Sequence, residues 1–322
     1  MSSEAELAPS AITTPRVAAT VAKTAVKKPH SRPTFRETWW RHLVGIIAIA
    51  ISLFPVVYIV SSAFNADNAL QSARVIPRHF TLHNFSALLH NDVIANTGAK
   101  QDVPYIHWFI NSMIIASLTA IFATMLGALA AYAFSRFRFK GRRMGMVALL
   151  LIQMFPQFVA VAAIYLIVLN LGAVFPAFGL NTLAAVVLVY LGGAMGVQAW
   201  LMKGFFDTIP AELDESARVD GATAAQIFWG VVLPLAAPVL AVVGLFSFVF
   251  TVNEFIIASV LLSARSKLPL TVGMRGYIDQ QYGQHWGPFT AGVLIASIPA
   301  IALFAFLQRF IVSGLTQGSV KG

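Results

Sequence analysis

Few residues of this chain combine a type and a spacing that support chemistry. Glu254 is the one acid inside the long apolar stretches, and an ionisable group at that depth is expected to face a cavity or a partner. His79, His83 and His90 resemble a metal site, but with no cysteine and only Asp92 as a nearby carboxylate we expect no metal there. Neither a His-Glu-x-x-His motif nor a Gly-x-x-x-x-Gly-Lys-Ser/Thr phosphate loop occurs. The sequence therefore predicts a chain without a catalytic or nucleotide-binding site of its own.

The elements that hold these residues are long apolar stretches. The 322-residue chain is 58% hydrophobic and 11% charged, which is about half the charge of an average soluble domain. Because about 20 helical residues cross ~30 Å of hydrocarbon, runs that lack Asp, Glu, Lys and Arg predict membrane-spanning helices. We predict an all-α polytopic membrane protein with six transmembrane helices, at residues 42–63, 108–134, 146–170, 181–203, 232–262 and 288–312.

Two basic segments orient the predicted helices. Residues 1–36 contain no apolar run and are interpreted as a disordered cytoplasmic tail. The segment 136–143 contains five bases and no acid. Since Lys and Arg collect in cytoplasmic loops, both segments belong inside the cell, and six crossings place both termini in the cytoplasm. Membrane orientation then explains the net charge of +9 without nucleic-acid binding.

One cytoplasmic loop differs because it is acidic. Residues 204–230, called the acidic loop from here on, contain Asp207, Glu212, Asp214, Glu215 and Asp220. A proline near its start, acids in the first turns, Arg218 four residues after Asp214, and Gly221 at the end predict a short helix with both ends marked. Thr223 and Gln226 have the spacing of a capping box and predict a second helix that leads into the fifth span. A capped linker and a docking site for a partner both fit this pattern.

Several segments match the motifs of one protein family. The acidic loop and the residues after it include Glu215-Ser-Ala217, Asp220-Gly-Ala222 and Val231-Val-Leu233-Pro234, where Ser216 and Val231 are mild departures from the family pattern. This region resembles the signature loop of the membrane subunits of bacterial binding-protein-dependent ABC importers. Other segments are similar to the six-span maltose and maltodextrin permease subunits of that family: Gln153-Met-Phe-Pro156, Gly179-Leu-Asn-Thr182, Tyr190-Leu-Gly-Gly193, Val272-Gly-Met274 and the ending Gly314 to Gly322.

The resemblance implies the type I ABC importer permease fold for residues 37–313, with the acidic loop as the coupling loop to an ATPase. The implied partners are a second permease subunit that completes a heterodimer, two copies of a cytoplasmic ATPase that binds ATP and Mg²⁺, and a periplasmic or extracellular sugar-binding protein at the bacterial inner membrane. The expected ATPase-coupling residues are Glu212, Glu215, Ala217, Asp220, Gly221, Ala222, Leu233 and Pro234. The C-terminal tail, residues 314–322, is expected to reach the ATPase in an extended form through Gly314, Gln317, Gly318 and Lys321.

The implied function is that of a pore-forming permease subunit of an ATP-driven importer for maltose and maltodextrins, which is not itself an enzyme. Alternatives are the same role for trehalose, sucrose or another α-glucoside, and, more distantly, a secondary sugar transporter. A sugar path needs polar groups inside the membrane, and the candidates are Asn253, Glu254, Gln153 and Tyr190. For Gln153 and Tyr190 an interhelical hydrogen bond is the competing interpretation. Outer residues such as Tyr277 and Trp286 are expected to face the binding protein or to anchor the chain at the membrane interface.

Overall fold

A computed structural model describes residues 35–66, 77, 79–90, 92–94, 100–102, 105–278 and 285–318. These residues are mainly helical, and one antiparallel pair of short strands, β1 (Asp92–Ile94) and β2 (Lys100–Asp102), joins two parts of the loop after the first span. The predicted N-terminal tail lies outside the described residues, except that its last two residues begin helix α1 at Phe35. The contacts divide the chain after Ile51, and the packing described below is that of the part from Ser52 onward.

Five helices among the described residues are long and apolar enough to cross a membrane, and a bent helix pair provides a sixth candidate. This agrees with the six predicted crossings when the bent pair is counted as one span. The five long helices are α1 (Phe35–Ala63), α3 (Tyr105–Arg136), α5 (Gln157–Val174), α6 (Leu183–Phe206) and α13 (Trp286–Gly318). Shorter elements are α2 (His83–Leu89), η2 (Pro176–Phe178), α7 (Ala211–Val219), η4 (Arg265–Lys267) and α12 (Leu270–Arg275).

The predicted third span, 146–170, is not one helix. It is divided into α4 (Arg142–Met154) and α5, and Phe155 and Pro156 between them are extended, with ψ of 127° and 117°. Pro156 has no backbone N–H, and its ring disfavours the helical conformation of Phe155. At 13 residues α4 is shorter than a membrane crossing requires. The membrane-spanning helix in this region is therefore α5.

The predicted fifth span, 232–262, is also wrong as a continuous helix. The chain turns by 79° at Ala236 and breaks again at Glu254 and Phe255. Pro234 and Pro238 remove backbone donors on both sides of the first turn. At the second break, Glu254 is extended with ψ of 130°. The resulting segments are α8 (Ala224–Ile227), the π-helical turn η3 (Phe228–Val232), α9 (Leu233–Leu235), α10 (Ala237–Asn253) and α11 (Ile256–Leu261).

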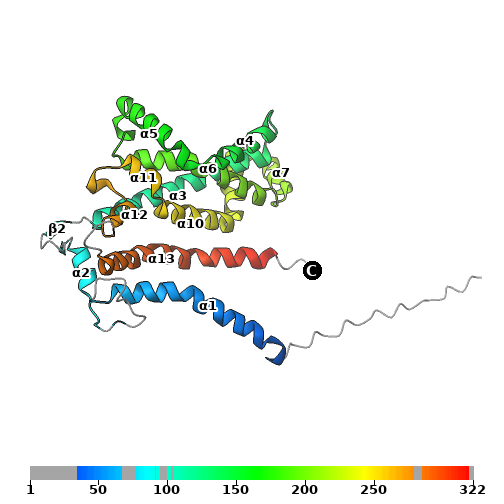
Figure 1. Cartoon of the computed structure of the whole chain (residues 1–322). Helices are drawn as coiled ribbons and strands as arrows, with labels where there is room; N and C mark the ends of the chain where they lie inside the picture. Colours follow the sequence, from blue (N-terminus) through cyan, green and yellow to red (C-terminus); the bar gives the residue numbers. More distant parts are fainter. Residues whose placement is uncertain are drawn as a thin grey trace, which may run out of the picture. The chain divides into compact units, whose positions relative to one another are not determined.

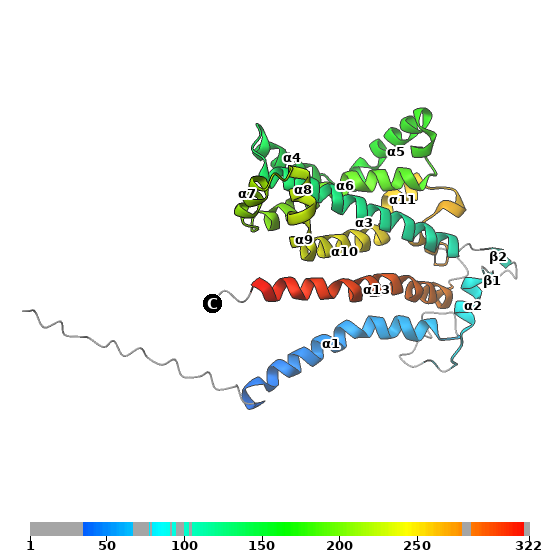
Figure 2. The same cartoon turned by 180° about the vertical axis from the view of Figure 1, so that it is seen from behind.

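Helix α3 is the centre of this packing. It lies along α6 and α10, and α13 packs against α10 (Figure 1). The view from behind shows the same order of helices, with α7 and α8 at one end of α3 (Figure 2). Helix α12 contacts α3 near its other end (Figure 1). Close approach of α3 and α6 depends on Gly127, because a Cβ there would lie 2.9 Å from Cβ of Gln198. The two ends of α3 therefore contact different segments, the acidic loop at one end and the segment around α12 at the other.

The N-terminal end of α3 is fastened to the segment before α12. Trp108 Nε1 donates to the carbonyl of Arg265 at 2.7 Å, and Asn111 Nδ2 donates to the carbonyls of Ser266 and Leu268 at 2.9 and 3.0 Å. Tyr277, which was expected at the surface, is instead buried with Leu88, Tyr105, Trp108, Leu270 and Met274. Its ring fills this cluster, and burial raises the pKa of its phenol. Tyr277 therefore stabilises the N-terminal end of α3 and is not part of an exposed docking face.

Gly273→Ala is expected to destabilise the protein, because the added Cβ would lie 2.1 Å from Cδ2 of Trp108. The indole is buried and held by its hydrogen bond, so it cannot move aside. Overpacking of this kind costs about 1–3 kcal/mol. Thermal unfolding of the purified complex in detergent measures the loss. Gly276→Ala is the control, since its Cβ would be 3.4 Å from the nearest atom, and equal midpoints for the two variants would contradict the expectation.

Candidate functional site

Helix α7 of the acidic loop begins and ends as its sequence predicts. Pro210 precedes it in an extended conformation, and Glu212 and Asp214 lie in its first turn, where acids interact favourably with the helix dipole. At its end Gly221 has φ of +84°. The N–H of Gly221 donates to Arg218 at 3.0 Å and that of Ala222 to Ala217 at 2.9 Å, which is the paired pattern of a Schellman motif.

The second predicted helix begins directly after this turn. Thr223 and Gln226 form the predicted capping box, in which each side chain bonds to the backbone N–H of the other residue. The two helices are thus joined by Gly221 and Ala222 with their ends satisfied. The acidic loop is therefore an ordered pair of short helices and not an irregular linker.

The predicted coupling residues divide between the surface and the interior. Glu212, Glu215, Asp220, Gly221 and Pro234 are exposed. Ala217, Ala222 and Leu233 are half-buried and pack against the cluster that includes Tyr132, Met202, Phe206 and Phe228. Two apolar residues of α7 that were not predicted as site residues are also exposed, Leu213 at 41% and Val219 at 88%. The outer face of α7 thus combines acidic and aliphatic side chains.

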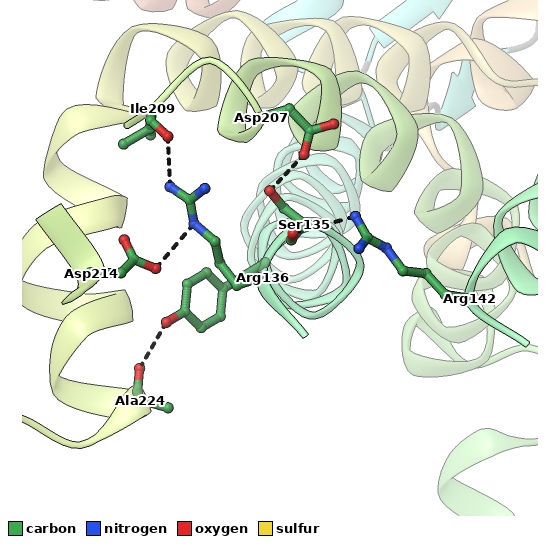
Figure 3. A network of polar contacts seen from close by, with 8 residues as sticks. Ser135, Arg136, Arg142, Asp207, Ile209, Asp214 and Ala224 are labelled. Carbon is green, nitrogen blue, oxygen red and sulfur yellow. Dashed lines mark hydrogen bonds and ion pairs between the residues drawn. The ribbon is translucent and has the colours of Figure 1, made fainter. Parts of the chain in front are cut away.

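The sequence did not predict the ion pair that holds α7. Arg136, the last residue of α3, has Nε 3.0 Å from Oδ2 of Asp214, with side chains that are 9% and 3% exposed (Figure 3). Asp214 points inward to α3 and pairs with Arg136, and not with Arg218 four residues later in its own helix. One signal was available: Asp214 lies three residues before Ala217, on the helix face that packs against the core.

A second polar group lies beside this pair. Ser135 Oγ donates to Oδ1 of Asp207 at 2.7 Å, and Arg142 Nη2 donates to the carbonyl of Ser135 at 3.3 Å (Figure 3). Lys203 Nζ lies 2.5 Å from Oδ2 of Asp207. Burial raises the pKa of the Asp207 carboxyl, but the hydrogen bonds from Lys203 and Ser135 and the charges of Lys203 and Arg142 outweigh it, so this pKa is lowered. Asp207 therefore joins the end of α6 to the end of α3.

The stabilising effect of Asp207 is expected to depend on pH. Its folded-state pKa lies below the ordinary value of 3.8, so its contribution is present above pH 3.8 and is lost as the pH falls through the folded-state pKa. The difference in thermal midpoint between the wild type and Asp207→Asn should therefore be larger at neutral pH than at acidic pH. A difference that is the same at both pH values would contradict this assignment.

Two of the four predicted path residues meet inside the membrane-spanning region. Tyr190 of α6 donates a hydrogen bond to Oε2 of Glu254. The same carboxylate accepts from the backbone N–H groups of Ile257 at 2.8 Å and Ala258 at 3.2 Å. Glu254 thus caps the first turn of α11 and fills the break after α10. The competing interpretation for Tyr190, an interhelical hydrogen bond, describes its contact in this structure.

The side chains of the other two predicted path residues make contacts separate from the Tyr190–Glu254 pair. Gln153 donates to the carbonyl of Gly193 and lines a cavity of about 1030 Å³ between α4, α5 and α6, where Gln157 also lies. Asn253 is exposed and donates to the carbonyl of Val249 in its own helix at 2.7 Å. The four side chains therefore form three separate sets of contacts.

The C-terminal segment differs from its predicted form. Helix α13 continues through Gly314 and Gln317 to Gly318, so the prediction of an extended backbone is wrong for these residues. A glycine inside a helix costs only about 1 kcal/mol relative to alanine, so isolated glycines do not by themselves end a long helix. Lys321 lies outside the described residues. In the part of the chain that the structure describes, no three His, Cys, Asp or Glu side chains are grouped to hold a metal ion.

Comparisons with known proteins identify a family of membrane transport proteins that this chain matches. Residues 123–317 match the family model described as "Binding-protein-dependent transport system inner membrane component". The chain is 36% identical over 280 residues to the galactooligosaccharides transport system permease protein GanQ of Bacillus subtilis (strain 168), covering 87% of this chain and 94% of the relative. It is 36% identical over 283 residues to the maltose/maltodextrin transport system permease protein MalG of Escherichia coli (strain K12), covering 87% and 95%.

A solved structure supports the arrangement of the helices. A bacterial ABC transporter involved in the import of the acidic polysaccharide alginate contains a chain that matches with a TM-score of 0.69 and 24% identity. The match covers 87% of this chain and 99% of that chain. At this identity the similarity is evidence for the fold only.

Proposed function

We propose a sugar-import role for this chain, which belongs to the family of inner membrane components of binding-protein-dependent transport systems, the permease subunits of ABC importers. It is a multi-pass inner membrane protein with the type I ABC importer permease fold. It is not an ATPase, because in this family ATP and Mg²⁺ bind to a separate partner. Its own contribution is a path across the membrane and a surface on which the partner acts.

The proposed substrates are maltose and maltodextrins. The observation that supports this choice is the 36–37% identity to MalG proteins over 87% or more of this chain, together with 34% identity to the maltodextrin permease MdxG of Bacillus subtilis (strain 168). Galactooligosaccharides are a second candidate, because GanQ is 36% identical over a similar length. Trehalose, sucrose and other α-glucosides share the same hydrogen-bonding chemistry and remain alternatives within the same role.

The proposed complex contains this chain as one half of a heterodimeric pore. A second permease subunit is the other half, two copies of the ATPase bind at the cytoplasmic side, and a sugar-binding protein binds at the outer side. Both termini of this chain lie in the cytoplasm in this arrangement. The five bases of residues 136–143 support this orientation, because they lie at the same end of α3 as the acidic loop.

The proposed ATPase-docking surface is the outer face of α7 with the turn that follows it. Glu212, Glu215 and Asp220 are exposed there, and Leu213 and Val219 add apolar area that a partner would cover. Three half-buried residues would support this surface by packing against the core: Ala217, Ala222 and Leu233. The exposed Gly221 would set the turn after α7, and Pro234 is proposed as a further exposed coupling residue. The C-terminal residues Gly314, Gln317, Gly318 and Lys321 are proposed as a second contact to the ATPase.

The proposed sugar path includes Gln153, Tyr190, Asn253 and Glu254. Gln153 has the most direct support, since it lines the large cavity beside the α4–α5 break. Tyr190 and Glu254 bond to each other and to α11, so a role in the path would require that they exchange these bonds for bonds to sugar. Asn253 is exposed at the end of α10.

Uptake competition tests the proposed substrate. The complete complex is reconstituted with its binding protein, and uptake of labelled maltose is measured against maltotriose, a galactooligosaccharide, trehalose and sucrose. We expect ATP-dependent uptake that maltotriose inhibits at a concentration about tenfold lower than the other sugars. Stronger inhibition by the galactooligosaccharide would favour the second candidate. Uptake that needs no ATPase would instead favour a secondary transporter.

A further inference from the structure

Helix α3 contacts the acidic loop before, within and after α7. Arg136 Nη2 donates to the carbonyl of Ile209 at 2.9 Å, just before α7, and Nε of the same side chain pairs with Asp214 inside α7 (Figure 3). Beyond α7, the hydroxyl of Tyr132 donates to the carbonyl of Ala224 at 3.4 Å. Both α3 residues lie in its last two turns. The loop is therefore bonded to α3 as well as continuous with α6 and α10.

The burial of the Arg136–Asp214 pair indicates that it fixes the position of α7 relative to α3. Exposed ion pairs form and break easily, but both of these side chains are more than nine-tenths buried. Burying two charges carries a desolvation penalty, and their attraction offsets it only when the two side chains are held in a favourable geometry. Such a pair is therefore weak evidence for stability and is better explained by a role in fixing one arrangement of the helices. Arg136 also bonds the backbone, which fixes the direction of its guanidinium.

The surroundings of the pair connect it to the rest of the membrane region. Tyr132 packs against Phe228 with ring centroids 5.2 Å apart, in a cluster that also includes Phe206 of α6 and Val243 of α10. Asp207 and Ser135 join the ends of α6 and α3 alongside. Any displacement of α7 that preserves these contacts must move the cytoplasmic end of α3, and α3 packs along both α6 and α10.

We propose that Arg136 is a positioning residue that locks α7 to α3 through Asp214, so that motion of the docked ATPase moves α3 directly and not only α10. The proposal rests on the proposed function, because it assumes that α7 is the docking helix. It assigns separate roles to two neighbouring acids of α7: Glu215 faces the partner, and Asp214 transmits the partner's motion into this chain. Loss of the pair leaves docking in place and lowers the sugar transported for each ATP hydrolysed.

The test measures ATP hydrolysis and sugar uptake together in reconstituted complexes. The variants are Arg136→Gln, Asp214→Asn, their combination, and Arg136→Lys. Arg138→Gln is the matched control, because Arg138 is an exposed base in the same segment. The readout is the coupling ratio, defined as sugar molecules transported per ATP hydrolysed, which does not depend on the amount of assembled complex. The wild type is measured first, since a wild type that shows no ATP-dependent sugar uptake would refute the proposed function rather than this inference.

We expect each single variant to lower the coupling ratio about tenfold while ATP hydrolysis continues. The double variant should lose no more than either single variant, because both changes remove one interaction. Arg136→Lys should recover part of the ratio, and Arg138→Gln should match the wild type. Unchanged ratios in the assembled single variants, or losses that multiply in the double variant, would overturn the proposal. Failure of Arg136→Lys to assemble would also overturn it, by showing that the pair serves folding.

Discussion

Glu215→Lys is expected to leave the chain folded in the membrane and to lower sugar uptake at least tenfold. Glu215 is exposed on α7, and a substitution at an exposed position usually changes stability by less than about 0.5 kcal/mol. At a docking surface the reversed charge would oppose whatever cation the ATPase presents. Juxtaposed like charges cost several kcal/mol, and each ~1.4 kcal/mol is a factor of ten in affinity. Docking should therefore fail where folding does not.

Two measurements separate these effects. The thermal midpoint of the purified permease reports its folding, and co-purification of the ATPase subunit reports docking. Glu215→Asp, which keeps the charge, is the matched control and should retain most of the docking. Normal ATPase recovery and normal uptake with Glu215→Lys would show that the outer face of α7 is not the docking surface.

Glu254→Ala is expected to cause the largest loss of stability. Its carboxylate accepts three hydrogen bonds, from the hydroxyl of Tyr190 and from the N–H groups of Ile257 and Ala258. Removing it leaves three donors without an acceptor, and all three donors belong to buried residues. Each buried unsatisfied donor costs about 1–3 kcal/mol, so the total is on the order of several kcal/mol. Since a folded protein is stable by only about 5–15 kcal/mol, little assembled complex should remain.

Two milder variants distinguish the cap from the hydrogen bond to Tyr190. Glu254→Gln keeps one oxygen acceptor and should give an intermediate loss of assembly and of uptake. Tyr190→Phe removes one donor and leaves the cap of α11 intact, so it should cost least of the three. The yield of assembled complex and its thermal midpoint rank the three variants by their loss of stability. Wild-type stability for Glu254→Ala would contradict the role of this carboxylate as a cap.

Features that depend on neighbouring residues could be predicted from the sequence. The helix of the acidic loop, its glycine turn and the capping box at Thr223 each involve residues within five positions of one another. The number of membrane crossings could also be predicted, because it depends on apolar length. The break at Pro156 was not predicted, because the separation of α4 from α5 depends on two extended residues that the apolar pattern does not reveal.

Features that join distant residues could not be predicted. Asp214 had a candidate partner four residues away in Arg218, and the structure pairs it with Arg136 on another helix instead. Glu254 was placed within a continuous helix, because an apolar run does not show where its backbone breaks. Its carboxylate replaces the acceptors that the broken helix lost, and this requires Tyr190 to approach from α6. Charge and apolar length thus predict elements, whereas buried polar partners depend on the folded arrangement.

The position of the acidic loop relative to the membrane is the most direct test of the proposed coupling. The chain contains no cysteine, so Val219→Cys introduces a single thiol at an 88% exposed position on the outer face of α7 and leaves the Glu215 carboxylate in place. A membrane-impermeant maleimide is applied to right-side-out and to inside-out vesicles that contain the complete complex. We expect labelling only in inside-out vesicles, with protection when the ATPase is bound. Labelling in right-side-out vesicles, or equal labelling with and without the ATPase, would contradict a cytoplasmic docking role for this loop.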